Sequence, residues 1–285
     1  MFNLPSLFTA TDEYSQKWQK RFLRAQKAQL IFLILAALGG STSWVPCGNF
    51  RLSALITMIA LVCAAFIKLY LVTNTPEKKW YNGRAAAESI KTLSWEYVSG
   101  AIPFEKTKDK TLVERLFLSR VGEILATVPT LDQPSIGLRQ LTKSMKDERK
   151  KSFTDRKSYY ITNRIEDQIT WYSNKSSFNS RRSSLWSVLL LALEIGAIVL
   201  ASLRFAGILE LDLAGVTATV VAAGISWIQS KQYETLSQSY SVTAQELARV
   251  GSLLETTNER DWPTSVEQAE EAISREHTLW LASHK

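Results

Sequence analysis

A single charged side chain lies deep within an apolar run of the sequence. Glu194 stands in the segment 185–203, where a helix would align it with Ser187 and bring it close to Ser202. A carboxylate inside a bilayer is costly unless it faces protein or water, so an intramembrane acid is a candidate functional residue. A ring of such carboxylates, one from each subunit of an oligomer, favours cations in a water-filled path. The chemistry that Glu194 predicts is therefore ion selection.

A second stripe, made of small and weakly polar residues, follows the segment 213–228 at steps of four, three and four. Its members are Gly215, Thr219, Ala222 and Ser226. Small residues at this spacing let helices approach closely, which favours tight packing within a hairpin. The alternative is a water-filled path between subunits that both stripes line. A structural hydrogen bond from Glu194 to a neighbouring span is a third interpretation.

The sequence contains no motif for catalysis or metal binding around these residues. Its only histidines, His277 and His284, lie near the C-terminus, and there is no H-E-x-x-H, phosphate-binding glycine loop or cysteine pair at metal spacing. The sequence therefore predicts a protein that is not an enzyme and that has no cofactor and no metal site.

Four nearly uncharged segments position the two stripes. They cover residues 28–45, 52–72, 185–203 and 213–228. A helix needs roughly 17 to 25 apolar residues to cross a bilayer core, and these segments approach or reach that length. The breaks between the first two and between the last two are too short to be more than turns. The sequence thus predicts two transmembrane helical hairpins.

The basic residues are placed asymmetrically around the four segments. Those that flank the segments away from the hairpin loops are Lys17, Lys20, Arg21, Arg24, Lys27, Lys68, Lys78, Lys79, Arg84, Lys175, Arg181, Arg182 and Lys231. The loops contain only Arg51 and Arg204. The positive-inside rule then predicts external loops, with both termini and the segment 73–182 in the cytoplasm. The net charge of +7 could otherwise suggest that the protein binds nucleic acid, but this placement of the basic residues argues against it.

Two polar helices carry stripes of charged residues next to tryptophan. The first, over 77–97, presents Trp80, Arg84, Glu88, Lys91 and Trp95. The second belongs to a continuous stalk helix predicted over 155–203, because no proline or glycine interrupts 153–183, and it presents Arg164, Asp167, Gln168 and Trp171. Tryptophan is costly to leave in water, so we expect the two stripes to pack against each other and to lock the halves of the chain together.

These residues carry a resemblance to a known family. In the second half the pattern is Tyr159, Tyr160, Arg164, Ile165, Glu166, Asp167, Gln168, Trp171 and Tyr172, with Asn179 ahead of a hairpin. In the first half it is Trp80, Arg84, Ala87, Glu88, Lys91 and Trp95 after a hairpin, and the chain ends with Glu276 and Trp280 one turn apart. The chain resembles two tandem modules of the SLATT superfamily, the SMODS and SLOG associating two-transmembrane effector domains.

The resemblance implies a bacterial membrane protein that forms pores or channels in conflict systems under the control of a nucleotide-signal enzyme or sensor. The chain has no such enzyme or sensor module, so nucleotide control would act through a separate cytoplasmic regulatory protein or through a site that the sequence does not reveal. We expect a first module over 1–100, a helical connector over 101–152 and a second module over 153–285.

Together these observations predict an all-α protein of the bacterial inner membrane, with two hairpins and long cytoplasmic stalk helices. We expect the bilayer, ions and further copies of the chain as partners, and an oligomeric, cation-conducting channel or pore-forming effector as the function. The alternative is a non-conducting scaffold or signal-relay subunit that binds a cytoplasmic partner.

Overall fold

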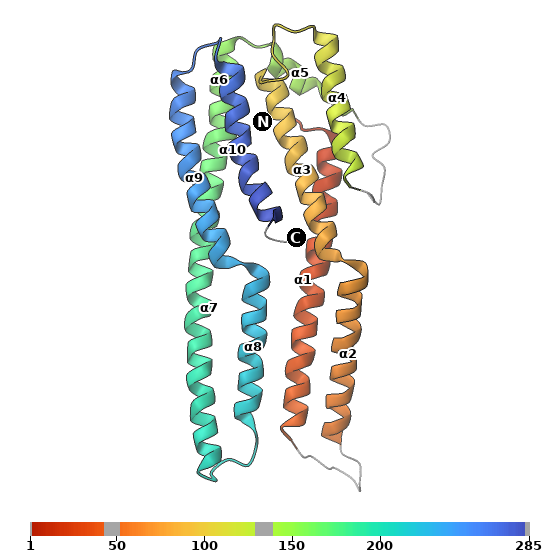
Figure 1. Ribbon diagram of the computed structural model, residues 1–285, viewed down its shortest axis with the longest axis vertical. Helices are drawn as coiled ribbons and strands as arrows, with labels where there is room; N and C mark the ends of the chain where they lie inside the picture. The colour runs from red at the N-terminus through yellow and green to blue at the C-terminus, as the bar shows by residue number, and fades with distance from the viewer. Residues whose placement is uncertain (1, 43–51, 129–138, 283–285) are drawn as a thin grey trace. The chain divides into compact units, whose positions relative to one another are not determined.

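The computed structural model describes residues 2–42, 52–128 and 139–282, with side chains up to Ser274, and every regular element in these ranges is helical (Figure 1). The elements are α1 Ser6–Gly40, α2 Leu52–Asn74, α3 Pro76–Ser99, α4 Lys110–Ala126, α5 Lys143–Lys150, α6 Phe153–Tyr160, the π-helical turn η1 Ile161–Glu166, α7 Asp167–Phe205, α8 Leu213–Lys231, α9 Tyr233–Thr256 and α10 Trp262–Ala282. The predicted all-α class is confirmed.

The chain separates into two compact units, and each draws on both halves of the sequence. Unit 1 comprises Met1–Trp18, Lys78–Ser177 and Ser237–Lys285. Unit 2 comprises Gln19–Glu77 and Phe178–Leu236. The long helices α1 and α7 contribute to both units, because each begins in unit 1 and ends in unit 2.

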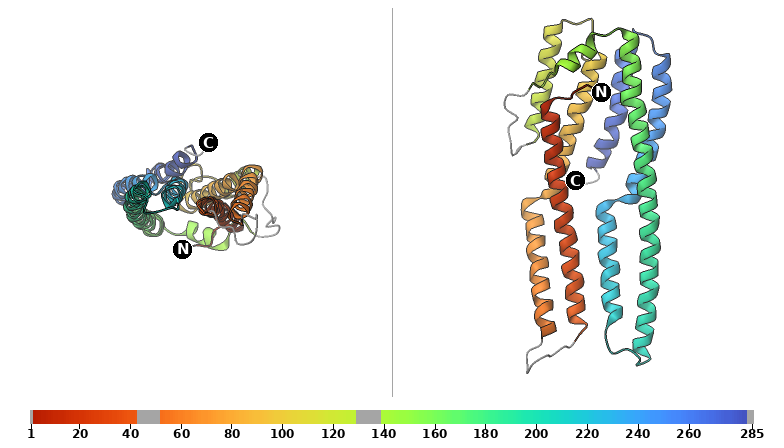
Figure 2. Two further views of the ribbon diagram at one scale, coloured as in Figure 1. Left: turned by 90° about the horizontal axis from the view of Figure 1, so that it is seen from below. Right: turned by 180° about the vertical axis from the view of Figure 1, so that it is seen from behind.

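Unit 2 contains the two predicted hairpins, α1 with α2 and α7 with α8 (Figure 2). Within the described ranges, four helical stretches are long and apolar enough to cross a membrane. Three of them contain a whole predicted span, and the first contains residues 28–40 of its span. The first predicted span, 28–45, extends too far: α1 ends at Gly40, and residues 43–45 lie outside the described ranges. The run Gly39, Gly40, Ser41 and Thr42 has low helix propensity, which accounts for the earlier end.

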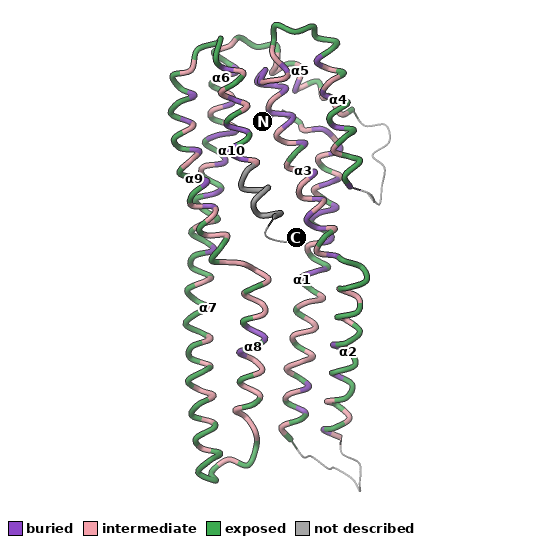
Figure 3. Tube along the Cα trace, viewed as in Figure 1, coloured by how far each residue is buried: buried purple, intermediate pink, exposed green. Residues whose placement is uncertain are grey.

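The surface of unit 2 is apolar. Its strongly exposed side chains include Phe66, Leu69 and Val72 on α2 and Val188, Leu191 and Ile198 on α7. In the most apolar window of the helix from Phe153 to Phe205, no residue is buried within the chain, as the green and pink stretches of α7 show (Figure 3). Exposing so much apolar area to water would be costly at about 25 cal/mol per Å². These helices are therefore suited to contact with lipid.

In each hairpin, the two helices approach each other closely at a glycine, which has no side chain. A Cβ atom built on Gly39 of α1 would lie 3.1 Å from the Ser53 carbonyl oxygen and 3.2 Å from the Thr57 nitrogen of α2. In the second hairpin, a Cβ atom on Gly224 of α8 would lie 2.8 Å from a methyl group of Leu190 on α7. The first hairpin thus depends on glycine for its spacing, whereas at Gly224 the Leu190 side chain could shift.

Unit 1 has an aromatic core between its helices. Trp95 of α3, Tyr160 of α6 and Trp262 of α10 are all buried, and the Tyr160 ring lies 5.7 Å from each of the other two rings, edge to face. Such pairs are favourable beyond the area that they bury. The burial of Trp95 and Trp262 fixes α3 and α10 against the start of the long helix.

That long helix is continuous, as predicted, and runs from Phe153 to Phe205. The sequence did not predict its π-helical turn at Ile161–Glu166, which contains Arg164. Single π-helical turns inside α-helices are rare and frequently occur at functional sites.

Candidate functional site

The polar stripe of α7 lies on the exposed surface of unit 2. Ser187, Glu194 and Ser202 are all exposed. The Ser187 hydroxyl donates to the Ser183 carbonyl oxygen at 3.0 Å, and the Ser202 hydroxyl donates to the Ile198 carbonyl oxygen at 2.9 Å. Both serine hydroxyls donate to backbone carbonyl oxygens of their own helix. Glu194 is therefore the residue of this stripe whose side chain remains available to bind water, an ion or another subunit.

Glu194 does not form the hydrogen bond to a neighbouring span that one interpretation required. Among the described residues, no side chain or backbone group bonds its carboxylate. At Gly224 of α8, the nearest side chains of α7 are instead those of Leu190 and Trp186. The carboxylate of the isolated chain is therefore presented outward from a membrane-length helix.

The residues of the α8 stripe have different roles. Gly215 accommodates the helix N-cap: its backbone N–H donates to Asp212 Oδ1 at 3.0 Å, and a Cβ atom there would lie 2.7 Å from Asp212 Oδ2. Thr219 is half-buried and donates to the Gly215 carbonyl oxygen at 3.0 Å, and Ser226 is also half-buried. The buried residues of α8 are instead Val221, Ala223 and Gly224. The stripe is thus not the main packing face of this helix.

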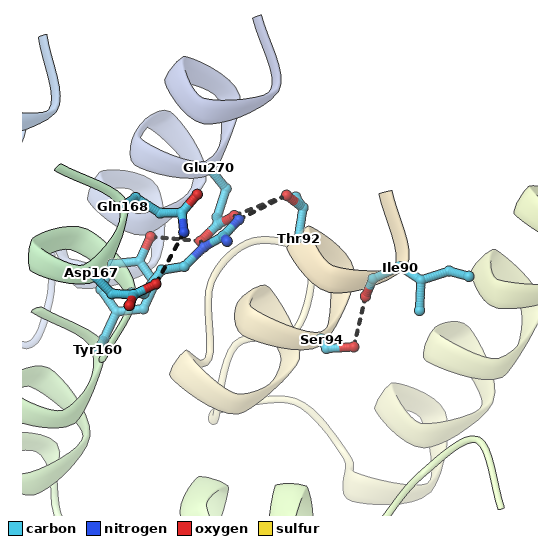
Figure 4. A network of polar contacts seen from close by, with 8 residues as sticks. Ile90, Thr92, Ser94, Tyr160, Asp167, Gln168 and Glu270 are labelled. Carbon is cyan, nitrogen blue, oxygen red and sulfur yellow. Dashed lines mark hydrogen bonds and ion pairs between the residues drawn. The ribbon is translucent and has the colours of Figure 1, made fainter. Parts of the chain in front are cut away.

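A second candidate site lies in the core of unit 1, around a buried ion pair (Figure 4). Arg164 Nη2 lies 2.6 Å from Glu270 Oε2, and Arg164 Nε donates to Glu270 Oε1 at 2.9 Å. The Tyr160 hydroxyl donates to Glu270 Oε1 at 2.9 Å, and the Thr92 hydroxyl donates to Glu270 Oε2 at 2.9 Å. The carboxylate therefore accepts bonds from three side chains on α3, α6 and η1. The guanidinium nitrogen Nη1 is buried and has no hydrogen-bond partner among the described residues.

Burial shifts the titration of the groups around this pair. Burial, followed by repulsion from Glu270, raises the pKa of Glu96 to about 8. Burial also lowers the pKa of Lys91, and both burial and Glu270 raise that of Tyr160. Burial acts to lower the pKa of Arg164, but the facing Glu270 carboxylate outweighs it and raises the pKa overall. Burial and the Glu270 carboxylate thus place a carboxyl group with a raised pKa, that of Glu96, near the ion pair.

The two predicted tryptophan-flanked stripes meet only in part. Glu88 and Lys91 act electrostatically on Arg164 and on each other, as expected for neighbouring stripes. Trp171 instead packs against Tyr240 of α9 at 5.4 Å. Asp167 is exposed and accepts a bond of 3.2 Å from the amide of the buried Gln168. Arg84 is half-buried on α3.

Sequence reasoning missed Glu270, which is the ion-pair partner of Arg164. A signal was present, because Glu270 lies on α10 at helical spacing with Val266, Ala269 and Ile273, all of which are buried. A carboxylate on the apolar face of an amphipathic helix requires a buried partner. The helix ending at Glu276 and Trp280 is formed, but those side chains lie outside the described residues.

Metal binding has no support in the described part of the chain. No cluster of three or more His, Cys, Asp or Glu side chains there could hold a metal ion.

Four membrane-length helices, two hairpins and a polar helical unit define a multi-pass membrane protein. The sequence comparisons identify its family: residues 5–157 match the SMODS and SLOG-associating 2TM effector domain 3, and residues 160–280 match the SMODS and SLOG-associating 2TM effector domain 1. The chain belongs to this SLATT family and carries two of its domains in tandem. No similar curated protein and no similar solved structure was found.

Proposed function

We propose that the protein is an oligomeric membrane effector that forms a cation-conducting channel or pore. The observation that carries the proposal is the exposed Glu194 on a membrane-length helix of a chain with two effector domains. A charged side chain at the centre of a bilayer costs roughly 2.5–3.5 kcal/mol on insertion scales when it has no protein or water beside it.

Oligomerisation removes this cost. The described part of the chain supplies no partner for Glu194, so the partner is water or a second copy of the chain. Copies arranged around an axis with this face of α7 inward would place one carboxylate per subunit in a ring. The ring would attract cations and repel anions. Four helices from one chain enclose little space, which also favours a path between subunits.

The protein would have a defined topology and cellular setting. The basic flanks favour cytoplasmic termini and external loops, in the inner membrane of a bacterium. The family's effector domains favour a role in a conflict system. A separate cytoplasmic protein would control opening, and no residue of the chain would be catalytic.

A second candidate is a non-conducting scaffold or relay subunit. It is favoured by apolar side chains exposed on unit 1, outside the predicted spans: Val242 is 64% and Leu253 54% exposed, both on α9. Such positions suit a protein partner.

Reversal potentials in a salt gradient across a planar bilayer test the proposal. Wild-type protein should conduct with a preference for cations, and Glu194→Gln should reduce cation conductance or selectivity, because it removes the field with little change of volume. The matched control is Glu210→Gln, which neutralises an exposed acid outside the spans.

Assembly of each variant is measured by light scattering in detergent. If Glu194→Gln assembles as wild type and keeps its reversal potential and conductance, the ring model is wrong. A wild-type protein that is silent under all conditions would favour the scaffold.

A further inference from the structure

The basic side chains of unit 2 gather at one end of its helices. In each hairpin, the first helix enters unit 2 at the same end at which the second helix leaves it. Gln26 of α1 is hydrogen-bonded to Ser230 of α8, which places the start of one hairpin beside the end of the other. The basic residues at this end are Lys20, Arg21, Arg24, Lys27, Lys68, Arg181, Arg182 and Lys231, and the acidic residues there are Glu77 and Glu234. The end therefore has a strong positive excess.

Three of these cations form an exposed stripe on α1. Lys20, Arg24 and Lys27 follow at steps of four and three, which places them on one helix face, and all three are exposed. Within the described ranges, no carboxylate lies at ion-pair distance from any of them. At the opposite end of unit 2, by contrast, Arg204 Nη1 is paired with Asp212 Oδ1 at 2.7 Å. The charge of the α1 stripe is not neutralised inside the chain.

Aromatic side chains accompany the cations at this end. Arg182 lies over the Phe178 ring at 5.4 Å, and Lys231 lies over the Trp227 ring at 5.3 Å. The next turns of α1 toward its loop are apolar, and Ile31 is 46% exposed. Basic and aromatic side chains next to an exposed apolar surface are typical of the level of the phospholipid headgroups.

We propose that the stripe Lys20, Arg24 and Lys27 binds the phosphate groups of anionic phospholipids. The ligand must be an anion, because three neighbouring cations lack a carboxylate. It must also be part of the bilayer, because the stripe continues into the lipid-facing part of the same helix. Anionic lipids attract basic side chains at the membrane surface, and the attraction falls off within a Debye length.

Lipid uptake measured by native mass spectrometry tests the proposal. Full-length protein, stripped of lipid in a neutral detergent, is offered equal amounts of phosphatidylglycerol and phosphatidylcholine. Wild-type protein should retain more phosphatidylglycerol. Lys20→Gln, Arg24→Gln and Lys27→Gln combined should lower the ratio of the two bound lipids by about fivefold or more, the factor expected for one basic side chain near an anionic surface.

A control variant separates the stripe from total charge. Lys110→Gln, Arg115→Gln and Arg260→Gln remove three exposed cations of unit 1 and should leave the ratio unchanged. The charge-conserving variant Lys20→Arg, Arg24→Lys and Lys27→Arg should also keep it. If the neutralised triple variant does not fold, Arg24→Gln alone should show a smaller fall. Equal retention of both lipids by wild type, or equal ratios for wild type and neutralised variants, would overturn the proposal, as would a fall in the unit 1 control.

Discussion

The Arg164 guanidinium and the Glu270 carboxylate form a buried, two-bonded ion pair, with 2.6 Å between Nη2 and Oε2 and 2.9 Å between Nε and Oε1. Arg164 lies in the π-helical turn of the long helix, and Glu270 lies on α10. The pair therefore holds the last helix of unit 1 against the helix that continues into a membrane hairpin.

Breaking this pair should strongly destabilise unit 1. Glu270→Ala leaves the buried guanidinium without its counter-charge, and removing one partner of such a pair typically costs about 3–5 kcal/mol. The free energy of unfolding, or the midpoint of thermal unfolding in detergent, measures the loss. The double variant Arg164→Met with Glu270→Leu should recover much of it, because no unpaired charge remains. A stability of Glu270→Ala close to wild type would contradict the assigned pairing.

Double-mutant cycles should rank the partners of Arg164. The cycle with Glu270→Ala should give a coupling energy of a few kcal/mol, since the two side chains are in direct contact. The cycle Glu88→Ala with Arg164→Ala should give on the order of 1 kcal/mol, because Glu88 acts on Arg164 electrostatically with no ion-pair contact. Strict additivity with Glu88 would remove the predicted contact between the two charged stripes.

The membrane hairpins were predictable because a span is a local property of the sequence. An apolar run of sufficient length, such as 52–72, identifies its helix without knowledge of the rest of the fold. The end of α1 at Gly40 was missed because the apolar run continues past the point where helix propensity falls. The π-helical turn at Ile161–Glu166 has no local signal of this kind in the sequence.

The partner of Arg164 depends on tertiary structure. Helical spacing correctly assigned Arg164 to a stripe on the long helix, but spacing does not say which helix covers that stripe. Two helices cover the stripe of Arg164, and each supplies a residue that accepts a hydrogen bond from the same guanidinium: Thr92 on α3 and Glu270 on α10. The charged residues of α3 were the more conspicuous candidates because tryptophans flank them, while Glu270 is one of three glutamates within five residues of α10.

Glycine at position 39 should be essential for the first hairpin. In Gly39→Ala the new Cβ atom would lie 3.1–3.2 Å from backbone atoms of Ser53 and Thr57, so α1 and α2 must separate. Overpacking of this kind typically costs about 1–3 kcal/mol. Gly196→Ala is the matched control, because nothing lies within 4 Å of its Cβ position, and it should be neutral or slightly stabilising. Equal thermal midpoints for the two variants would show that the close approach at Gly39 is not needed.

Cysteine labelling should report the topology. The loop 43–49 lies outside the described residues, and the basic flanks predict that it faces the exterior. In a protein without Cys47 and Cys63, Asn49→Cys should react with an impermeant thiol reagent added to intact cells. Lys110→Cys, exposed on α4, should react only after the membrane is opened. The reverse pattern would invert the proposed topology.

Glu96 should make the stability of unit 1 depend on pH. Its pKa is raised from the model-peptide value of 4.5 to about 8, first by burial and then by electrostatic repulsion from Glu270. Glu267 adds to the rise, while Arg120 and Arg164 oppose it. Between these two pKa values the folded protein binds more protons than the unfolded chain, so this group makes the free energy of unfolding decrease as the pH increases. Its contribution is present in full below about pH 4.5 and is lost by about pH 8.

Glu96→Gln should reduce the decrease in the free energy of unfolding with increasing pH, because an amide resembles the protonated carboxyl and does not titrate. Stability measured from pH 5 to pH 8 should therefore fall less steeply in Glu96→Gln than in wild type, and the variant should be the more stable protein at pH 8. The control Glu123→Gln changes an exposed glutamate of α4 and should keep the wild-type slope. If wild type and Glu96→Gln decline with the same slope, ionisation of Glu96 is not linked to the folding of unit 1.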